Sequence, residues 1–264
     1  MAATTGTMIG EKRGPIGVMT FDNPAKLNAV SLAMWEEGER ILNGFIADPA
    51  VRVIVVTGAG GKAFVSGADI SRFEDERASE EAVRRYNSAV ERIYAAIYDL
   101  PKPTIAMIRG YCIGGGLGLA VACDIRICSD KSSFSLPAAK LGLGYGYGGL
   151  RRFIDVFGPA VTKEIFYTAR RYEAAQALAM GMVGHVLPDE QVEPFVMDMA
   201  KAIAENAPLT VTAVKRIAQE AVKDPDERDI ELCERLVLDC FASKDYVEGR
   251  RAFMEKRRPQ FIGA

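Results

Sequence analysis

The chain has 264 residues, 49% of them hydrophobic, and a formal net charge of −2. This length suits one large domain, or one domain with an appendage, that buries a substantial core. The weak acidity argues against nucleic acid as a partner, since that function requires a basic surface. Residues 1–14 lack the apolar core of a secretory signal, and the longest uncharged run, residues 110–123, is too short to cross a bilayer. We therefore expect a soluble, cytoplasmic protein with no membrane partner.

The cysteines are odd in number and include no C-x-x-C pair, which indicates neither a disulfide framework nor a zinc site. They are Cys112, Cys123, Cys128, Cys233 and Cys240. We expect reduced, mostly buried thiols and no bound metal.

Apolar runs with helical patterns between several of them predict an α/β fold. The predicted strands are Gly17–Phe21, Val51–Thr57, Thr104–Ile108, Ile125–Cys128 and Gly184–Leu187. The first clear helix follows Ser31, a residue suited to the N-cap, and ends at Asp48-Pro49. Trp35 and Leu42 lie on the face of this helix that should pack on the sheet.

From about Gln191 onward the strand patterns disappear and helices follow one another. Prolines interrupt them at Ala207-Pro208 and Asp224-Pro225. We therefore expect a core of residues 1–195 and a C-terminal helical region of residues 196–264.

A glycine cluster is the most informative feature of the sequence. Residues 102–120 are typical of a strand, a tight turn and a helix, with Gly114, Gly115 and Gly116 at the start of that helix. Glycines there allow a ligand to approach the backbone, and the free N–H groups and positive dipole end favour a developing oxyanion. Gly115 is the natural donor. Close helix packing is the competing explanation of such a cluster.

A second loop of small residues, residues 58–70, follows the strand Val51–Thr57. The backbone N–H of Ala68 is the expected second donor.

Several blocks occur in order along the chain and together resemble the enoyl-CoA hydratase/isomerase (crotonase) family. They are residues 24–29, 62–64, 67–70, 110–111, 114–116, 123–124, 174–175 and 181–183. The resemblance extends over nearly the whole chain. It implies a crotonase-like spiral of ββα units, a C-terminal helical region that covers the site, and assembly into homotrimers or dimers of trimers. It also implies that the N–H groups of Ala68 and Gly115 form an oxyanion hole for the thioester oxygen.

The resemblance further implies a binding site for coenzyme A, which enters as part of the substrate, with no separate cofactor. The residues assigned to it are Lys26, Leu27, Ala29, Ala63, Ile70, Gly114, Phe253 and Lys256. The first three would lie along the nucleotide end, and Ala63 and Ile70 near the pantetheine arm. Phe253 and Lys256 would contact the adenosine diphosphate, in some family members from a neighbouring subunit.

The sequence departs from the family where hydratases carry two glutamates, because Gly118 and Ala138 stand at those positions. Hydration needs one group to take a proton from water and another to deliver one to carbon. Residues 131–154 contain no Asp or Glu that could replace them. The usual two-glutamate hydration is therefore not expected.

Tyr145, in the glycine-rich loop of residues 141–149, is the leading candidate for the remaining catalytic group. Its position resembles that of a tyrosine in the methylmalonyl-CoA decarboxylase branch, although Ala68 stands where that branch has a histidine. Decarboxylation suits a site without a base, because the leaving carboxylate itself generates the enolate. Packing or hydrogen bonding is the competing role for this tyrosine.

Three interpretations stay open at this stage. The first is an acyl-CoA-processing lyase or isomerase with atypical acid and base residues, to which residues 74–76 could contribute a carboxylate. The second is a decarboxylase of the methylmalonyl-CoA type. The third is a non-catalytic acyl-CoA-binding protein.

Overall fold

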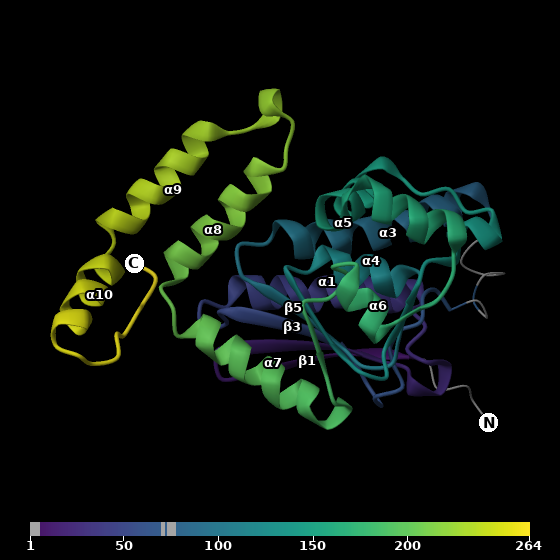
Figure 1. Ribbon diagram of the computed structural model, residues 1–264, viewed down its shortest axis with the longest axis horizontal. Helices are drawn as coiled ribbons and strands as arrows, with labels where there is room; N and C mark the ends of the chain where they lie inside the picture. Colours follow the sequence, from purple (N-terminus) through teal and green to yellow (C-terminus); the bar gives the residue numbers. More distant parts are fainter. Residues whose placement is uncertain (1–5, 70–71, 73–77) are drawn as a thin grey trace.

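The computed structural model describes residues 6–69, 72 and 78–264. The chain winds between two sheets (Figure 1), one in the order β1-β2-β3-β5-β7-β10 and one in the order β4-β6-β8-β9. The first sheet comprises β1 (Thr7–Arg13), β2 (Ile16–Asp22), β3 (Val53–Gly58), β5 (Thr104–Ile108), β7 (Ile125–Ser129) and β10 (His185–Leu187). The second comprises β4 (Ala63–Val65), β6 (Tyr111–Ile113), β8 (Ser133–Ser135) and β9 (Tyr172–Glu173).

From β3 to β8, consecutive strands alternate between the two sheets, which makes the core a spiral. β3, β5 and β7 pair in parallel in the first sheet, and β4, β6 and β8, which follow them one by one, pair in parallel in the second. Each turn thus contributes one strand to each sheet before the chain moves to the next. The expected α/β spiral of ββα units is confirmed.

Helices cover both faces of the six-stranded sheet. One side carries α1 (Leu32–Ala47), α3 (Glu80–Asp99), α4 (Gly115–Ala122), α5 (Tyr147–Thr168) and α6 (Ala174–Ala179), and the other carries α7 (Asp189–Ala204). Alternate residues of β3 face opposite sides, as strand geometry requires: Ile54 and Val56 join the larger core, whereas Val53 and Val55 pack with Val192 of α7. Short 3-10 helices occur at η1 (Pro24–Lys26), η3 (Pro137–Leu141) and η4 (Pro225–Glu227).

The predicted strands all occur, within two residues of the expected bounds, and Thr104–Ile108 matches at both ends. Ser31 caps α1 as expected, because its hydroxyl accepts from the Met34 N–H at 3.4 Å. Strand β1 was not predicted, nor were the strands of the second sheet, which have only two or three residues each and show no period. The expected boundary between residues 195 and 196 falls inside α7, whose apolar residues pack on the sheet.

Three of the cysteines, Cys112, Cys123 and Cys128, are buried, and the other two are partly buried. Burial raises the pKa of Cys123 and of Cys128 to about 12, which keeps both thiols protonated. Among the described residues, no cluster of His, Cys, Asp or Glu has the arrangement of a metal site. Nor is any helix in that part of the chain long and apolar enough to cross a membrane.

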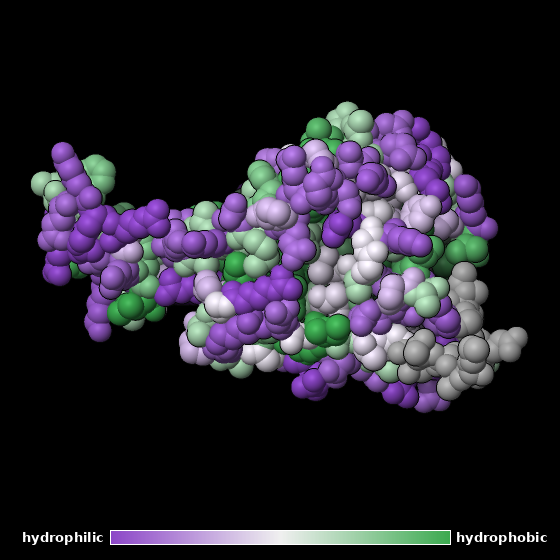
Figure 2. Space-filling model, turned by 90° about the horizontal axis from the view of Figure 1, so that it is seen from below, coloured by the Kyte–Doolittle hydropathy of each residue, from purple (hydrophilic) through white to green (hydrophobic). Residues whose placement is uncertain are grey.

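Beyond α7 the chain leaves the core as an arm, formed by α8 (Pro208–Ala221), α9 (Ile230–Ala242) and α10 (Lys244–Met254). The arm projects from the rest of the molecule and carries hydrophobic patches among its hydrophilic side chains (Figure 2). Its exposed large apolar side chains are Val214, Val222, Ile230, Val237, Leu238, Phe241, Tyr246, Val247, Phe253, Met254 and Ile262.

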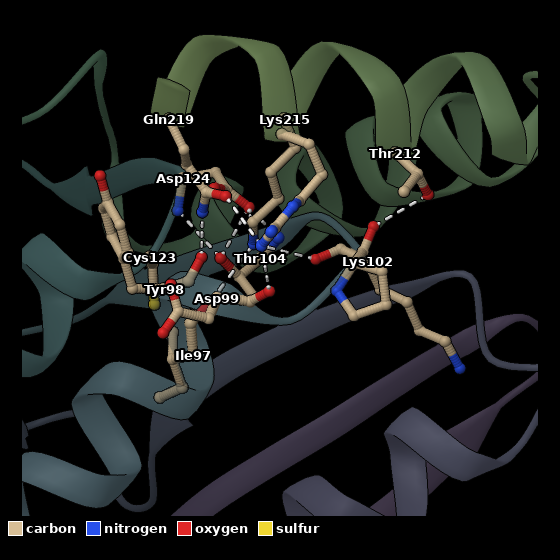
Figure 3. A network of polar contacts seen from close by, with 12 residues as sticks. Ile97, Tyr98, Asp99, Lys102, Thr104, Cys123, Asp124, Thr212, Lys215 and Gln219 are labelled. Carbon is tan, nitrogen blue, oxygen red and sulfur yellow. Dashed lines mark hydrogen bonds and ion pairs between the residues drawn. The ribbon is translucent and has the colours of Figure 1, made fainter. Parts of the chain in front are cut away.

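Polar contacts dock α8 on the core (Figure 3). The buried Lys215 ammonium donates to the Asp124 carboxylate at 2.9 Å and to the Lys102 carbonyl at 3.2 Å. The same carboxylate accepts from the N–H and hydroxyl of Thr104, and Thr212 donates to the Pro101 carbonyl at 3.0 Å. These bonds flank a cavity of about 770 Å³ between α8, α5 and the C-terminal end of α4.

Candidate functional site

Two loops that are distant in sequence converge at the start of α4. A Cβ atom built on Gly67 would lie 3.9 Å from the Gly115 nitrogen, and one built on Gly115 would lie 3.9 Å from the Gly67 Cα. The segment after β4 and the first turn of α4 are therefore in contact. This is the juxtaposition that the two predicted donors, Ala68 and Gly115, require.

The N–H of Ala68 faces away from its neighbouring strand. Ala68 forms a parallel bridge with Val30, in which the Val30 N–H donates to the Gly67 carbonyl at 2.9 Å and the Asp69 N–H donates to the Val30 carbonyl at 3.0 Å. The Gly67 carbonyl and the Asp69 N–H make the bonds to Val30, so the N–H of Ala68 points away from Val30. Within the described part of the chain it donates to no protein acceptor.

The N–H of Gly115 is one of the groups that a helix leaves unpaired at its N-terminus. Gly114 precedes it with φ of +56°, a conformation that glycine tolerates, and donates its own N–H to the Ser135 carbonyl at 2.8 Å. The Gly115 N–H has no protein acceptor among residues 6–69, 72 and 78–264. The positive end of the α4 dipole adds to the preference for an oxyanion.

Part of the glycine cluster serves packing. A Cβ atom on Gly116 would lie 2.1 Å from the Val65 carbonyl oxygen, so only glycine lets α4 approach β4 this closely. The competing explanation of close helix packing therefore holds for Gly116, while Gly115 keeps a free donor.

The space beside Gly118 is filled by two tyrosines. A Cβ atom on Gly118 would lie 3.1 Å from the Tyr145 hydroxyl, 3.1 Å from the Tyr94 hydroxyl and 3.0 Å from a Tyr94 ring carbon. These phenols occupy the volume next to Gly118, one of the two positions where the family resemblance leads us to expect a glutamate in a hydratase. The other glutamate position, Ala138, is buried in η3.

Tyr145 is held by aromatic contacts, with its ring centroid 4.9 Å from that of Phe166 and 6.1 Å from that of Phe153. Burial raises its pKa to about 12. At neutral pH this phenol is protonated, so it can donate a proton but cannot act as a base. Its hydroxyl lies beside α4, next to Gly118.

Tyr94 was not among the predicted site residues. Its hydroxyl donates to the Gly115 carbonyl at 2.5 Å, and burial raises its pKa well above the usual value. The signal was present in the sequence, since Tyr94 lies on an apolar face of α3 with Tyr86, Ile93 and Ile97. A tyrosine on a buried face normally requires a partner for its hydroxyl.

A carboxylate on α3, that of Glu91, also lies near these two tyrosines. Glu91 pairs with Arg152 at 2.7 Å, and Arg152 lies 5.9 Å from the centre of the Tyr94 ring. The Glu91 charge contributes to the raised pKa values of Tyr94 and Tyr145.

The predicted coenzyme residues near the N-terminus surround the segment after β4. The Lys26 ammonium lies 2.8 Å from the Asp69 carboxylate and is partly exposed. Leu27 is exposed and has φ of +53°, whereas Ala29 and Ala63 are buried, so Ala63 presents little side chain to a ligand. Ile70 lies outside the described residues, as do residues 74–76.

Phe253 and Lys256 lie at the far end of the arm, at and just beyond the end of α10. Phe253 is 83% exposed. The arm extends away from the core that holds Ala68 and Gly115 (Figure 1), so one chain does not bring these two residues to its own predicted donors.

The chain is similar to known proteins over nearly its whole length. The model of the enoyl-CoA hydratase/isomerase family matches residues 11–264. The chain is 32% identical to a crotonyl-CoA hydratase of Syntrophomonas wolfei subsp. wolfei over 97% of each protein. It is 35% identical to a carnitinyl-CoA dehydratase of Citrobacter koseri, with 96% of this chain and 97% of the relative covered. The crystal structure of an enoyl-CoA hydratase/carnithine racemase from Magnetospirillum magneticum is similar with a TM-score of 0.92 and 32% identity, covering 99% of this chain and 97% of that one.

Proposed function

Because the chain belongs to the enoyl-CoA hydratase/isomerase family, we propose that it holds the carbonyl oxygen of an acyl-CoA thioester between the N–H groups of Ala68 and Gly115. The observation that carries this proposal is the contact between Gly67 and Gly115, which brings together two backbone donors without protein acceptors among the described residues. Coenzyme A enters as part of the substrate, and the reaction needs no separate cofactor.

The two donors would act on the charge that develops during the reaction. As an enolate forms, negative charge moves onto the thioester oxygen, and both N–H groups bind it more strongly than they bind the neutral carbonyl. Each donor in such a hole contributes about 3–4 kcal/mol of transition-state stabilisation. The α4 dipole acts in the same direction.

Tyr145 is the proposed proton donor. With a pKa of about 12 it remains a neutral phenol, so it favours a reaction in which the enolate arises without a base. Loss of CO₂ from a substrate with a carboxylate on the α-carbon meets this condition. The electrons of the broken C–C bond pass to the thioester oxygen, and the phenol then protonates the α-carbon and recovers its proton from water. Gly118 and Ala138 leave the alternative, glutamate-dependent hydration, without its usual groups.

The arm would complete the site by association with other copies of the chain. Its exposed apolar side chains favour burial in an assembly, as homotrimers or dimers of trimers. In such an assembly Phe253 and Lys256 would contact the adenosine diphosphate of a substrate bound to a neighbouring subunit.

The test measures turnover of methylmalonyl-CoA and of crotonyl-CoA by the purified protein and by Gly115→Pro, which lacks the N–H. Gly115→Ala is the matched control, since it keeps the N–H and adds a Cβ atom 3.2 Å from the Tyr94 hydroxyl. We expect Gly115→Pro to lower kcat by about 100-fold or more relative to Gly115→Ala. Release of CO₂ from methylmalonyl-CoA identifies the decarboxylase, whereas rapid hydration of crotonyl-CoA refutes the reasoning from the missing glutamates.

A non-catalytic role is the alternative. If a broad panel of thioesters is bound but not converted, the protein is an acyl-CoA-binding protein, and Gly115→Pro then changes affinity alone.

A further inference from the structure

Two tyrosines of α3 donate hydrogen bonds to backbone carbonyls, one near each of the two donors of the proposed oxyanion hole. Tyr86 and Tyr94 are eight residues apart, a little over two turns, so they lie on the same helical face. Both are buried, at 3% and 4% exposure. The Tyr86 hydroxyl donates to the Val30 carbonyl at 3.1 Å, and the Tyr94 hydroxyl donates to the Gly115 carbonyl at 2.5 Å.

The Tyr86 bond acts on the half that contains Ala68. The Val30 carbonyl accepts from both the Tyr86 hydroxyl and the Asp69 N–H, and the Val30 N–H donates to the Gly67 carbonyl. Ala68 lies between Gly67 and Asp69, which both bond to Val30. Holding Val30 in place therefore holds the peptide plane that contains the Ala68 N–H.

The Tyr94 bond acts on the other half more directly. Gly115 supplies the donor N–H, and Tyr94 binds the carbonyl of the same residue. Glycine has the largest conformational freedom of any residue, and Gly114 and Gly116 flank it, so an added bond to this carbonyl restricts the orientation of the first turn of α4.

Trp35 of α1 connects the two tyrosines. Its indole N–H donates to the Tyr86 hydroxyl at 3.0 Å, and its ring meets the Tyr94 ring edge to face with centroids 5.8 Å apart. Since Trp35 is itself buried, a shift of Tyr86 would leave the indole N–H without its partner, which is costly. A shift of Tyr94 would break its ring contact with Trp35 and its bond to the Gly115 carbonyl.

We propose that Tyr86 and Tyr94 are positioning residues, through which α3 sets the spacing and orientation of the Ala68 and Gly115 N–H groups. This inference rests on the proposed function, because it assumes that these two groups bind the thioester oxygen. Donors of this kind must be held within about 0.5 Å of the productive geometry, and a misplacement of about 1 Å can lower the rate by about 100-fold.

The experiment uses a chromophoric arylacryloyl-CoA, whose absorption moves to longer wavelength when its carbonyl oxygen accepts strong hydrogen bonds. Titration into the wild type, Tyr94→Phe and Tyr86→Phe gives both the band shift and the dissociation constant. Both substitutions keep the ring and remove the hydroxyl. Tyr98→Phe is the matched control, because it removes a hydroxyl one turn further along α3, where the side chain lines the cavity beside α8.

We expect Tyr94→Phe to lose at least half of the wild-type band shift while its affinity for free coenzyme A changes less than about threefold. Tyr86→Phe should lose part of the shift, and Tyr98→Phe should keep it. A full shift in Tyr94→Phe, even with a lowered melting temperature, shows a purely structural role and overturns the inference while the oxyanion hole stands. Absence of the shift in the wild type refutes the proposed hole itself. If Tyr86→Phe does not fold, Tyr94→Phe alone decides.

Discussion

The volume beside Gly118 is the place where the proposed chemistry departs from that of a two-glutamate hydratase. The loss of a glutamate would usually leave room for a water molecule, but Tyr94 and Tyr145 approach the Gly118 Cβ position within about 3 Å. A side chain at this position must move one of the two tyrosines. In the proposed function, a site without an acid at Gly118 and with two phenols beside it is one arrangement.

We predict that Gly118→Glu does not create a hydratase. The added side chain overpacks against the two tyrosines and lowers the free energy of unfolding by about 1–3 kcal/mol. Urea denaturation and a crotonyl-CoA assay measure the two effects. Gly144→Ala is the control, since a Cβ atom at Gly144 meets no atom within 4 Å. Efficient hydration by Gly118→Glu would contradict this prediction, because it would show that Tyr94 and Tyr145 move aside at little cost.

The raised pKa of Tyr145 predicts a loss of stability at alkaline pH. An unfolded tyrosine titrates near 10 and the folded one at about 12. Between these values the unfolded state has lost the proton that the folded state retains, so the free energy of unfolding falls with rising pH by up to about 1.4 kcal/mol per unit. Tyr145→Phe should show a shallower fall between pH 10 and 12, measured by denaturation at each pH. An unchanged slope would contradict the burial of this hydroxyl.

At the scale of elements, α8 is held to the core mainly by polar contacts rather than by a continuous apolar face. Lys215 makes more of them than any other residue of the helix, because its side chain is only 6% exposed and reaches the Asp124 carboxylate and main-chain carbonyls of the core. A buried charge of this kind is stable only while its partners are present.

Lys215→Met should therefore lower the free energy of unfolding by about 2 kcal/mol, since it removes the charged hydrogen bond to Asp124, whose partly exposed carboxylate keeps its bonds from Thr104. Thr212→Val, which removes one exposed hydrogen bond from the same helix, should cost less than about 1 kcal/mol. Equal losses in the two variants would show that the ion pair adds nothing to the docking of α8.

At the scale of the whole molecule, the arm exposes a series of large apolar side chains that its own chain does not cover. The large side chains of α9 and α10, including Leu238 at 65% and Phe241 at 59% exposure, are the clearest examples. The position of Phe253 and Lys256 at the end of the same arm connects assembly to coenzyme binding in the proposed function.

We predict that sedimentation shows trimers or hexamers of the wild type and that Leu238→Asp with Phe241→Asp shifts the protein toward monomers. Helix content should persist, because both side chains lie largely outside the chain's own core, and circular dichroism checks this point. Asp239→Asn, an exposed change on the same helix, is the control. A wild-type monomer at micromolar concentration would contradict the assembly.

Local patterns in the sequence predicted an α/β fold and the first helix with its Ser31 cap, and ordered blocks of residues indicated the family, whose resemblance implied the spiral. They do so because strand and helix periods and the glycine blocks are properties of neighbouring residues. The positions of Ala68 and Gly115 followed from two such blocks, and the structure brings these residues together. Whether the two groups bind a thioester oxygen stays a prediction.

Only the tertiary structure decided which side chains surround these two N–H groups. Tyr94 lies 21 residues before Gly115 and Tyr145 lies 27 residues after Gly118, and no local period connects them. The pairing of Lys26 with Asp69 and the direction of the arm likewise depend on contacts between distant segments. Packing of α3, α4 and the loop before α5 fixes the environment of the two donors, because a hydroxyl can bind a carbonyl only after the helices have met.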